Sequence, residues 1–559
     1  MGIAALIEDL SFTYRETNRP ALNHITGQIE DGTFAVLMGH GGAGKSTLCY
    51  ALNALVPRFF RGDYAGRVVV KNQVVSEARV AEMSRLVGLV LQDFEAQLFS
   101  TSVELEVAFG PENHRLPRDE IKRRIVRYLD FVGLLAMQQR EPASLSGGQK
   151  QRLAIASVLA LEPDLLVMDE PTTDLDPIGR EEVLSVADML RQENRTLLIV
   201  DHEPETAETA DQVWLMKEGR LIVQGPPHQV MTDLAALEAA GVKPPPTMEL
   251  FHQMGWPGSP LTLAEAKAAI EQHNLAQPQP LDLASLSSIN TDHPIILAAE
   301  GLRHVYPTRN IEALHDINVQ IGEGEFVAIL GQNGSGKTTL AKHFNGLLQP
   351  TSGEIRVAGR PAQTLSRREL AQTVGYVFQN PDHQIFANTV REEVGFSLKV
   401  AGFDAPAIKQ RVGEALAVVG LSGYEEEVPF VLTKGERQRV AVASVLATQP
   451  QVIILDEPTT GLDYGRQRSM MDMLRMLNQR GHTIIIITHS MWVAAEYAQR
   501  TIVLRDGRVT LDGSTRAVFA QEDELALAAL RPPTLLRLGN WLGTHTLTVA
   551  QMVQELKAR

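Results

Sequence analysis

The sequence predicts an α/β protein made of two tandem modules, each with a mainly parallel sheet covered by helices. Three observations support this. The chain holds two glycine-rich phosphate-binding loops, the same motifs recur in the same order in each half, and apolar strand-like runs alternate with helical ones. At 559 residues the chain also exceeds the size of one hydrophobic core.

The modules are copies of each other. GHGGAGKST at 39–47 recurs as GQNGSGKTT at 331–339, which is 292 positions later. LSGGQKQR at 145–152 recurs as LTKGERQR at 432–439, only 287 positions later. The first copy therefore has five extra residues, which fall within VPRFFRGDYAG (56–66). Such collinear repeats indicate a duplication.

The repeat continues past the last motif. KPPPTMEL (243–250) matches RPPTLLRL (531–538), and LTLAEAKAAI (261–270) matches LTVAQMVQEL (547–556). Apolar residues at helical spacing indicate a helical extension in each copy, either a packing element or a dimer contact. The predicted units are a first domain at 1–240, its extension at 241–275, a Pro/Ser-rich linker at 276–294, a second domain at 295–528 and its extension at 529–559.

Composition limits the partners. Asp and Glu outnumber Lys and Arg by 67 to 52, a net charge of −15, so we expect no nucleic-acid partner. The single cysteine, Cys49, excludes a disulfide framework and fits a reducing cytoplasm. No run approaches the roughly 20 apolar residues of a spanning helix, so we expect membrane association through partners only.

Each copy places its motifs at the ends of apolar strands. TFAVLMGH and EFVAILGQ lead into the glycine-rich loops, and helices are expected to begin at Lys45 and Lys337. DLLVMDE and QVIILDE end in paired acids, and TLLIVDH and TIIIITH end in histidine.

Both loops satisfy G-x-x-x-x-G-K-[ST], the pattern that curls backbone N–H groups around a phosphate. Lys45 and Lys337 would reach the β- and γ-phosphates of ATP, and the hydroxyls of Ser46 and Thr338 would bind Mg²⁺. The expected loop contacts are Gly39, Gly42, Gly44, Lys45, Ser46 and Thr47 in the first copy and Gly331, Gly334, Gly336, Lys337, Thr338 and Thr339 in the second.

The strand-end acids suit metal binding and general-base catalysis. Asp169 and Asp456 would hold Mg²⁺ through water, and Glu170 and Glu457 would activate the attacking water. The alternative is that adjacent acids only cap a helix. Further expected contacts are Gln92 and Gln379 with the metal or the water, and His202 and His489 with the γ-phosphate.

Tyr14 and Tyr306 lie upstream of their loops at the same 292-residue offset. Stacking of either ring on adenine would contribute about 1–3 kcal/mol. Core packing is the alternative for both tyrosines.

Together these motifs resemble the ATP-binding-cassette (ABC) family, because LSGGQ is its signature. The resemblance implies a phosphate-loop core, a helical signature subdomain and a small antiparallel β part. It also implies that two cassettes close head to tail as an intramolecular pair, so that each ATP meets the opposite signature. The ATP of Lys337 would meet Ser146, Gly147, Gly148 and Gln149, and that of Lys45 would meet Thr433, Lys434, Gly435 and Glu436.

The second signature departs from the family pattern. Lys434 replaces a glycine, and Glu436 brings a negative charge towards the triphosphate. We expect two bound ATPs and unequal hydrolysis, with the Lys337 site faster.

A narrower resemblance concerns the residues after each Gln. QDFEAQLFSTSVELEVAFGPEN and QNPDHQIFANTVREEVGFSLKV look like the corresponding segment in ATPases of energy-coupling-factor importers, which also carry C-terminal extensions. This implies coupling helices of a transmembrane subunit docked around Gln92–Phe109 and Gln379–Phe396, and a small membrane substrate-binding subunit. The cargo would be a vitamin, a vitamin precursor or a cobalt or nickel ion, and the location the cytoplasmic face of the cell membrane.

Three other kinds of tandem cassette fit this sequence less well. A ribosome-acting cassette pair has a long basic linker, whereas residues 244–294 here contain one basic residue, Lys267. A DNA-repair cassette needs zinc-binding cysteines. A fused sugar-importer ATPase fits the paired extensions less well.

Overall fold

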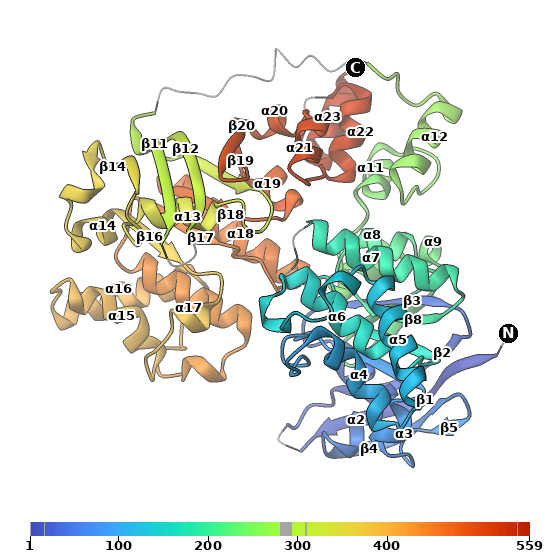
Figure 1. Ribbon diagram of the computed structural model, residues 1–559. Helices are drawn as coiled ribbons and strands as arrows, with labels where there is room; N and C mark the ends of the chain where they lie inside the picture. Colours follow the sequence, from blue (N-terminus) through green and yellow to red (C-terminus); the bar gives the residue numbers. More distant parts are fainter. Residues whose placement is uncertain are drawn as a thin grey trace. The chain divides into compact units, whose positions relative to one another are not determined.

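The computed structural model describes residues 2–15, 17–173, 175, 177–279, 293–307, 310–544 and 546–559. The chain forms two compact units, divided near residue 265 (Figure 1). Each unit carries one copy of the predicted α/β module, which confirms the predicted fold class. Most of the predicted linker lies outside the described residues, and the predicted domain boundaries stay predictions.

The central sheet of the first unit has six strands in the order β10-β9-β3-β8-β7-β6. All neighbours are parallel except the edge strand β10, which is antiparallel to β9. Strands β3, β7 and β8 are buried along their whole length, as expected for continuous apolar runs between two helical layers. The strands are β3 (Phe34–Gly39), β6 (Val87–Val90), β7 (Leu165–Asp169), β8 (Thr196–Val200), β9 (Gln212–Lys217) and β10 (Arg220–Gly225).

The second unit repeats this sheet in the order β16-β17-β18-β13-β19-β20. Its edge strand β20 is again antiparallel to its neighbour. The strands are β13 (Phe326–Leu330), β16 (Val374–Val377), β17 (Val452–Asp456), β18 (Thr483–Ile487), β19 (Arg500–Arg505) and β20 (Arg508–Ser514).

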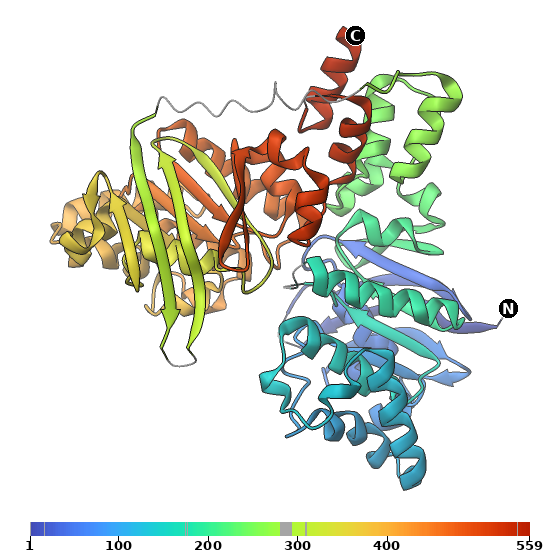
Figure 2. The ribbon, with the colours of Figure 1, turned by 45° about the horizontal axis from the view of Figure 1, so that its top comes forward.

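Each unit also has a four-stranded antiparallel sheet, which provides the small β part that the family resemblance implied. In the second unit β11 and β12 form its long hairpin, drawn in yellow-green in Figure 2. The strands are β1 (Ile3–Tyr14), β2 (Leu22–Glu30), β4 (Gly62–Val70) and β5 (Gln73–Val74) in the first unit, and β11 (Ile295–Tyr306), β12 (Ile311–Gly322), β14 (Ser352–Val357) and β15 (Arg360–Pro361) in the second.

Three helices in each unit pack on one another and carry the signature (Figure 1). They are α4 (Val103–Asn113), α5 (Arg118–Phe131) and α6 (Gly147–Leu159) in the first unit, and α15 (Val390–Val400), α16 (Ala405–Val418) and α17 (Lys434–Leu446) in the second. Their apolar faces join the hydrophobic core of their own unit.

The helices that follow the phosphate loops begin where the sequence predicts. They are α1 (Lys45–Leu52) and α13 (Lys337–Phe344). The other helices that accompany the parallel strands are α7 (Pro177–Gln192), α8 (Pro204–Glu208), α18 (Tyr464–Gln479) and α19 (Met491–Tyr497).

Both predicted extensions are helical. They contain α11 (Pro246–Met254) and α12 (Leu263–His273) after the first copy, and α22 (Thr534–Leu542) and α23 (Val549–Ala558) after the second. Met248 belongs to the core of the first unit and Leu536 to that of the second, which supports the packing interpretation. In the described part of the chain, no helix has the length and apolar character needed to cross a bilayer.

Candidate nucleotide sites

Each phosphate loop is shaped by a glycine in a left-handed conformation just before its helix. Gly44 has φ 99° and Gly336 has φ 101°, and each is the N-terminal cap of α1 or α13. A Cβ atom on Gly44 would lie 2.3 Å from the carbonyl oxygen of Ala21, so no larger residue fits. The helix N-terminus therefore faces the loop, where backbone N–H groups favour an anion.

The loop lysines fold back over the carbonyl groups of their own loops. Lys45 Nζ donates to the oxygens of Gly39 and His40 at 2.8 and 3.0 Å, and Lys337 Nζ donates to two equivalent carbonyl oxygens, both at 2.8 Å. Lys45 is only 5% exposed. Burial lowers the pKa of Lys45, while the Glu170 carboxylate opposes that shift. A phosphate at this position would add a closer anion to the buried ammonium than Glu170, whose carboxylate lies 4.0 Å away.

The strand-end aspartates fit a cation. Asp169 is 1% exposed, and both of its carboxylate oxygens lack a hydrogen-bond partner within the described residues. Burial raises the pKa of Asp169 to about 6. Asp456 instead accepts hydrogen bonds of 2.8 Å from the hydroxyls of Thr338 and Tyr376. Buried carboxylates beside a Ser or Thr hydroxyl are hard oxygen ligands of the kind that Mg²⁺ takes.

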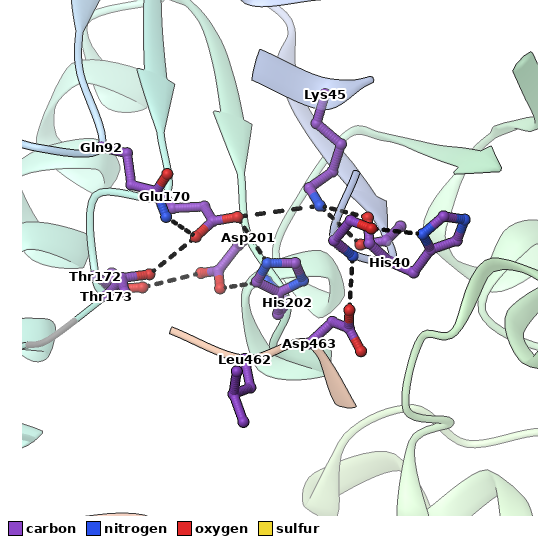
Figure 3. A network of polar contacts seen from close by, with 12 residues as sticks. His40, Lys45, Gln92, Glu170, Thr172, Thr173, Asp201, His202, Leu462 and Asp463 are labelled. Atoms are coloured by element: carbon purple, nitrogen blue, oxygen red, sulfur yellow. Dashed lines mark hydrogen bonds and ion pairs between the residues drawn. The ribbon is translucent and has the colours of Figure 1, made fainter. Parts of the chain in front are cut away.

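Glu170 is the centre of the polar network in the first site (Figure 3). Its Oε1 lies 2.7 Å from His202 Nε2 and 4.0 Å from Lys45 Nζ, and its Oε2 accepts from Gln92 Nε2 at 2.7 Å. Burial alone would raise the pKa of Glu170, but the hydrogen bond and charge of His202, with the charge of Lys45, hold it below its ordinary range. Glu170 is thus an ionised carboxylate at neutral pH, as a general base requires.

The second site keeps the glutamate–histidine contact. Glu457 Oε1 lies 3.0 Å from His489 Nδ1. Glu170 and Glu457 both have φ 50°, an unusual conformation for a residue with a side chain, and it recurs at the same point in both copies. Among the described residues, Gln379 makes no hydrogen bond to Glu457, so the two sites differ in this contact.

Sequence reasoning missed one buried acid of the first site. Asp201 accepts hydrogen bonds from the backbone N–H of His202 at 2.6 Å and from the Thr206 hydroxyl at 2.7 Å. It therefore fixes the loop that carries His202. The corresponding residue of the second copy is Thr488, so the duplicate gave no signal for an acid here.

Tyr14 and Tyr306 are tied to their phosphate loops. The hydroxyl of Tyr14 lies 3.1 Å from Thr47 Oγ1, and that of Tyr306 lies 3.1 Å from Thr339 Oγ1. Both rings therefore stand next to the helix that follows the loop. Their contact with adenine stays a prediction.

The two signatures begin α6 and α17 with the same capping box but different hydrogen bonding. In the first copy, the Gln149 side chain accepts from Ser146 N at 3.0 Å, and Gln149 N donates to the Ser146 hydroxyl. In the second, the Glu436 carboxylate accepts from both the N–H and the hydroxyl of Thr433, at 2.8 and 2.7 Å. Within the described residues, the first signature has no hydrogen bond to its own phosphate loop.

The segment after Gln92 lines a cavity of about 1040 Å³ in the first unit. Phe99 and Phe109 meet edge to face at 4.6 Å on its wall, and Phe99 is 62% exposed. The buried Glu106 carboxylate accepts the backbone N–H groups of Phe99 and Ser100 at 3.0 and 2.8 Å. This glutamate thus fixes the aromatic pair to α4.

The second copy repeats the aromatic pair. Phe386 and Phe396 meet at 4.8 Å, and Phe386 is 59% exposed. The buried Glu393 accepts the backbone N–H groups of Phe386 and Ala387.

Each site therefore combines a phosphate loop, a buried lysine, a strand-end Asp–Glu pair and a histidine on the glutamate. The ammonium and loop N–H groups can neutralise phosphate oxygens, and the glutamate can accept the proton of an attacking water. This defines a phosphate-loop ATPase with two sites.

Comparison with known proteins identifies the family. The family model described as "ABC transporter" matches residues 22–173 and 314–460. The chain belongs to the ABC transporter ATPases, and it is the ATP-binding and ATP-hydrolysing subunit of such a transporter.

Relatives align over nearly the full length. A protein of Caldanaerobacter subterraneus subsp. tengcongensis, provisionally named an ABC transporter ATP-binding protein, is 47% identical over 98% of each chain. One of Methanosarcina acetivorans with the same provisional name is 40% identical over 99% of this chain and 94% of its own.

Solved structures match single cassettes. The cbiO1 protein of Clostridium perfringens, titled as part of the ABC transporter complex cbiONQ, is 38% identical. It covers 44% of this chain and 98% of its own, with a TM-score of 0.39. The cassette MJ0796, solved with ADP and Pi, is 31% identical and covers 39% of this chain and 99% of its own, with a TM-score of 0.37.

Proposed function

We propose that this chain is the fused ATPase of an energy-coupling-factor importer, which uses ATP to drive uptake of a vitamin, a vitamin precursor or a cobalt or nickel ion. Its partners are a transmembrane coupling subunit and a small membrane protein that binds the cargo. The chain is held at the cytoplasmic face of the membrane through these partners.

The observation that carries this proposal is the repeated aromatic pair after each glutamine. Large exposed rings are costly in water and are typical of surfaces that a partner covers. The buried glutamates hold the pairs Phe99–Phe109 and Phe386–Phe396 in place without needing a partner. A rigid apolar wall beside a cavity suits an amphipathic coupling helix, which inserts apolar side chains at helical spacing.

Within each cassette, the chain's own groups prepare the reaction. The lysine and the loop N–H groups would hold the triphosphate, and Glu170 or Glu457 would take the proton of the attacking water. Ser46 with Asp169, and Thr338 with Asp456, would hold Mg²⁺, which supplies charge neutralisation on the phosphates when bound. His202 and His489 orient the glutamates through the contacts described above.

The two cassettes are proposed to close head to tail on two ATPs and to hydrolyse them unequally. The signature that serves the ATP of Lys45 is the altered one. Its Thr433 hydroxyl already donates to Glu436, so it is not available to a phosphate oxygen. Although burial opposes it, the Thr433 hydrogen bonds hold the pKa of Glu436 below its ordinary range, so this side chain stays an anion.

The deciding experiment is co-purification. The tagged chain is isolated from detergent-solubilised membranes of its host, and bound proteins are identified by mass spectrometry. We expect a polytopic subunit and a small hydrophobic protein, whose ligand identifies the cargo. The variant Phe99→Ser/Phe386→Ser should lose both partners while ATP binding by the isolated chain persists. Ribosomal proteins, or a sugar-type membrane partner, would refute the proposal and leave only the ATPase assignment.

A further inference from the structure

A buried pair of histidines distinguishes the second nucleotide site from the first. His304 lies on β11 and His343 in the last turn of α13, and they are 6% and 1% exposed. His304 Nδ1 is 3.2 Å from His343 Nε2, and the rings meet at 4.7 Å. Their positions in the first copy are occupied by Phe12 and Ala51.

The pair closes a ring of four contacts with two residues of the nucleotide site. His343 Nδ1 lies 2.7 Å from the carbonyl oxygen of Thr339, and the Thr339 hydroxyl lies 3.1 Å from that of Tyr306. The Tyr306 ring then packs edge to face on His304 at 4.6 Å. Thr339 and Tyr306 are the residues expected to contact phosphate and adenine.

The hydrogen bonds indicate which ring nitrogens carry the protons. A carbonyl oxygen only accepts, so His343 Nδ1 carries a proton and its neutral ring leaves Nε2 bare. That atom accepts from His304 Nδ1–H, which also lies 3.1 Å from the carbonyl oxygen of Gln349. His304 Nε2 is buried with no partner in the described structure. A proton on His343 Nε2 would therefore face the N–H group of His304 and break the contact between the two rings.

Neighbouring charges do not stabilise a cation on the pair. Burial lowers the pKa of His343, and the charge of His304 lowers it further; together they outweigh the hydrogen bonds to the carbonyl oxygens of Thr339 and Gln349, which raise it. The loop 345–351 between α13 and β14 has no charged residue. Tyr306 is the titratable side chain that packs on His304. The charged groups on the surrounding elements are Lys337 and Lys342 on α13, Arg303 and Glu300 on β11, Glu312, His315 and Asp316 on β12, and Glu354 and Arg356 on β14.

Most of those charged groups are engaged elsewhere. Arg303 pairs with Glu312, and Glu312 also contacts His315 at 3.0 Å. Arg356 pairs with Glu354 at 2.7 Å.

We propose that His304 and His343 are positioning residues of the second nucleotide site, which hold Tyr306 and Thr339 only while the His343 ring is neutral. ATP affinity at the Lys337 site then falls as the pH drops below the ordinary histidine value of about 6.5. The inference rests on ATP binding, not on the proposed cargo.

The direction follows from linkage. A histidine with a lowered pKa in the closed site takes up a proton more readily when the site opens. The closed arrangement is therefore fully stable above the ordinary pKa and loses stability as the pH falls below it. One coupled proton weakens binding by at most about tenfold per pH unit.

The first copy is the internal control. Its Tyr14 makes the same 3.1 Å contact to Thr47, but the ring packs on Phe12 at 4.9 Å and near Phe60 at 6.2 Å. The adjacent Tyr50 has a pKa raised to about 12 by burial, so this aromatic cluster does not titrate near neutral pH.

The test measures binding of a non-hydrolysable ATP analogue with Mg²⁺ to the full chain from pH 7.5 to 5.5. Lys45→Ala leaves the second site as the reporter, and Lys337→Ala leaves the first. Two further variants are made in the Lys45→Ala chain. The double variant His304→Phe/His343→Ala carries the residues of the first copy. The single variant His343→Gln keeps an amide that can donate to the Thr339 carbonyl but does not titrate.

Between pH 7.5 and 5.5, we expect the Kd of the second site to rise about fivefold more in the Lys45→Ala chain with both histidines than in either histidine variant. This difference lies within the limit set by one coupled proton. His343→Gln should keep most of the affinity at pH 7.5. The phosphates of the ATP analogue also titrate in this pH range, but they do so equally with every variant, so the comparison between variants cancels their effect. If the variants show the same pH dependence as the parent, the inference is wrong. If the double variant does not fold, the pH dependence of the Kd of His343→Gln is compared with that of its parent, and this comparison alone tests the inference.

Discussion

The Thr433 hydroxyl donates to the Glu436 carboxylate at 2.7 Å, whereas in the first signature no described residue accepts a hydrogen bond from the Ser146 hydroxyl. The capping box is the same in both copies, so the difference lies in the side chain at its third position. A carboxylate attracts the hydroxyl proton more strongly than the neutral Gln149 amide does. The second signature is therefore intact as a helix start and altered as a phosphate ligand.

Removing the charge should restore the altered site. In a Glu457→Gln background, which silences the Lys337 site, Glu436→Gln should raise ATPase activity about fivefold, the effect of one hydrogen bond. The reciprocal variant Gln149→Glu, made in a Glu170→Gln background that silences the Lys45 site, should lower the remaining ATPase activity by a similar factor. Steady-state ATPase assays on the purified chain measure both. A fall in rate with Glu436→Gln would count against the hydroxyl argument.

Glu170 and Glu457, the predicted general bases, should contribute unequally to the ATPase rate. If the Lys337 site is faster, Glu457→Gln should remove most of the total ATPase rate, whereas Glu170→Gln should remove the smaller share. Loss of a general base costs about 10²–10⁴-fold at the site concerned. Single-turnover hydrolysis with both variants gives the two rates, and equal residual rates would contradict the predicted asymmetry.

Asp201 should matter only to the first site. Asp201→Asn keeps the size but weakens the acceptor for His202 N and the Thr206 hydroxyl, which should lower the free energy of unfolding by about 1–3 kcal/mol. The Glu170–His202 contact should loosen, and hydrolysis at the Lys45 site should slow. Denaturant unfolding and ATPase assays check this, with Thr488→Ser in the second copy as the matched control. An unchanged rate in Asp201→Asn would make Asp201 purely structural.

Much of the architecture followed from the sequence because it depends on local pattern. Apolar strands such as TFAVLMGH end at a glycine-rich loop, and the helix starts at Lys45 and Lys337 were predicted correctly. The catalytic roles of the predicted residues stay predictions, although Lys45, Gln92, Glu170 and His202 do converge.

The residues that were missed act through tertiary contacts. Asp201 and Tyr376 have no like partner in the other copy, where Thr488 and Leu89 stand, so the repeat could not mark them. Glu106 and Glu393 are repeated, but a glutamate in a helix is usually solvated. Only the fold shows that both are buried acceptors for loop N–H groups.

Glu208 gives the first unit a pH-dependent stability. Burial, with the carboxylates of Glu205 and Glu265, raises the pKa of Glu208 to about 8. The native state therefore holds this proton more tightly than the unfolded chain, and its stabilising effect is lost as the pH rises through 8. Glu208→Gln should leave the melting temperature nearly unchanged at pH 4, near the ordinary glutamate pKa of about 4.3, and raise it at pH 9. Equal shifts at both pH values would show that Glu208 does not titrate in this range.

Glu106 and Glu393 should be needed for coupling rather than for ATP binding. Each carboxylate accepts two loop N–H groups, and a glutamine can accept them only as a weaker, neutral acceptor. Glu106→Gln/Glu393→Gln should therefore loosen the pairs Phe99–Phe109 and Phe386–Phe396 and reduce the yield of co-purified membrane subunits several-fold. The ATPase rate of the isolated chain should stay within about twofold, because neither glutamate contacts the nucleotide residues. The neighbours Glu104 and Glu392 provide matched control variants, since Glu→Gln there removes the same charge from the same helices without removing a backbone contact of the aromatic pairs; Glu104 accepts from the Gln139 side chain instead. Loss of partners in the control as well would mean that net charge on α4 and α15, and not the fixed aromatic wall, governs docking.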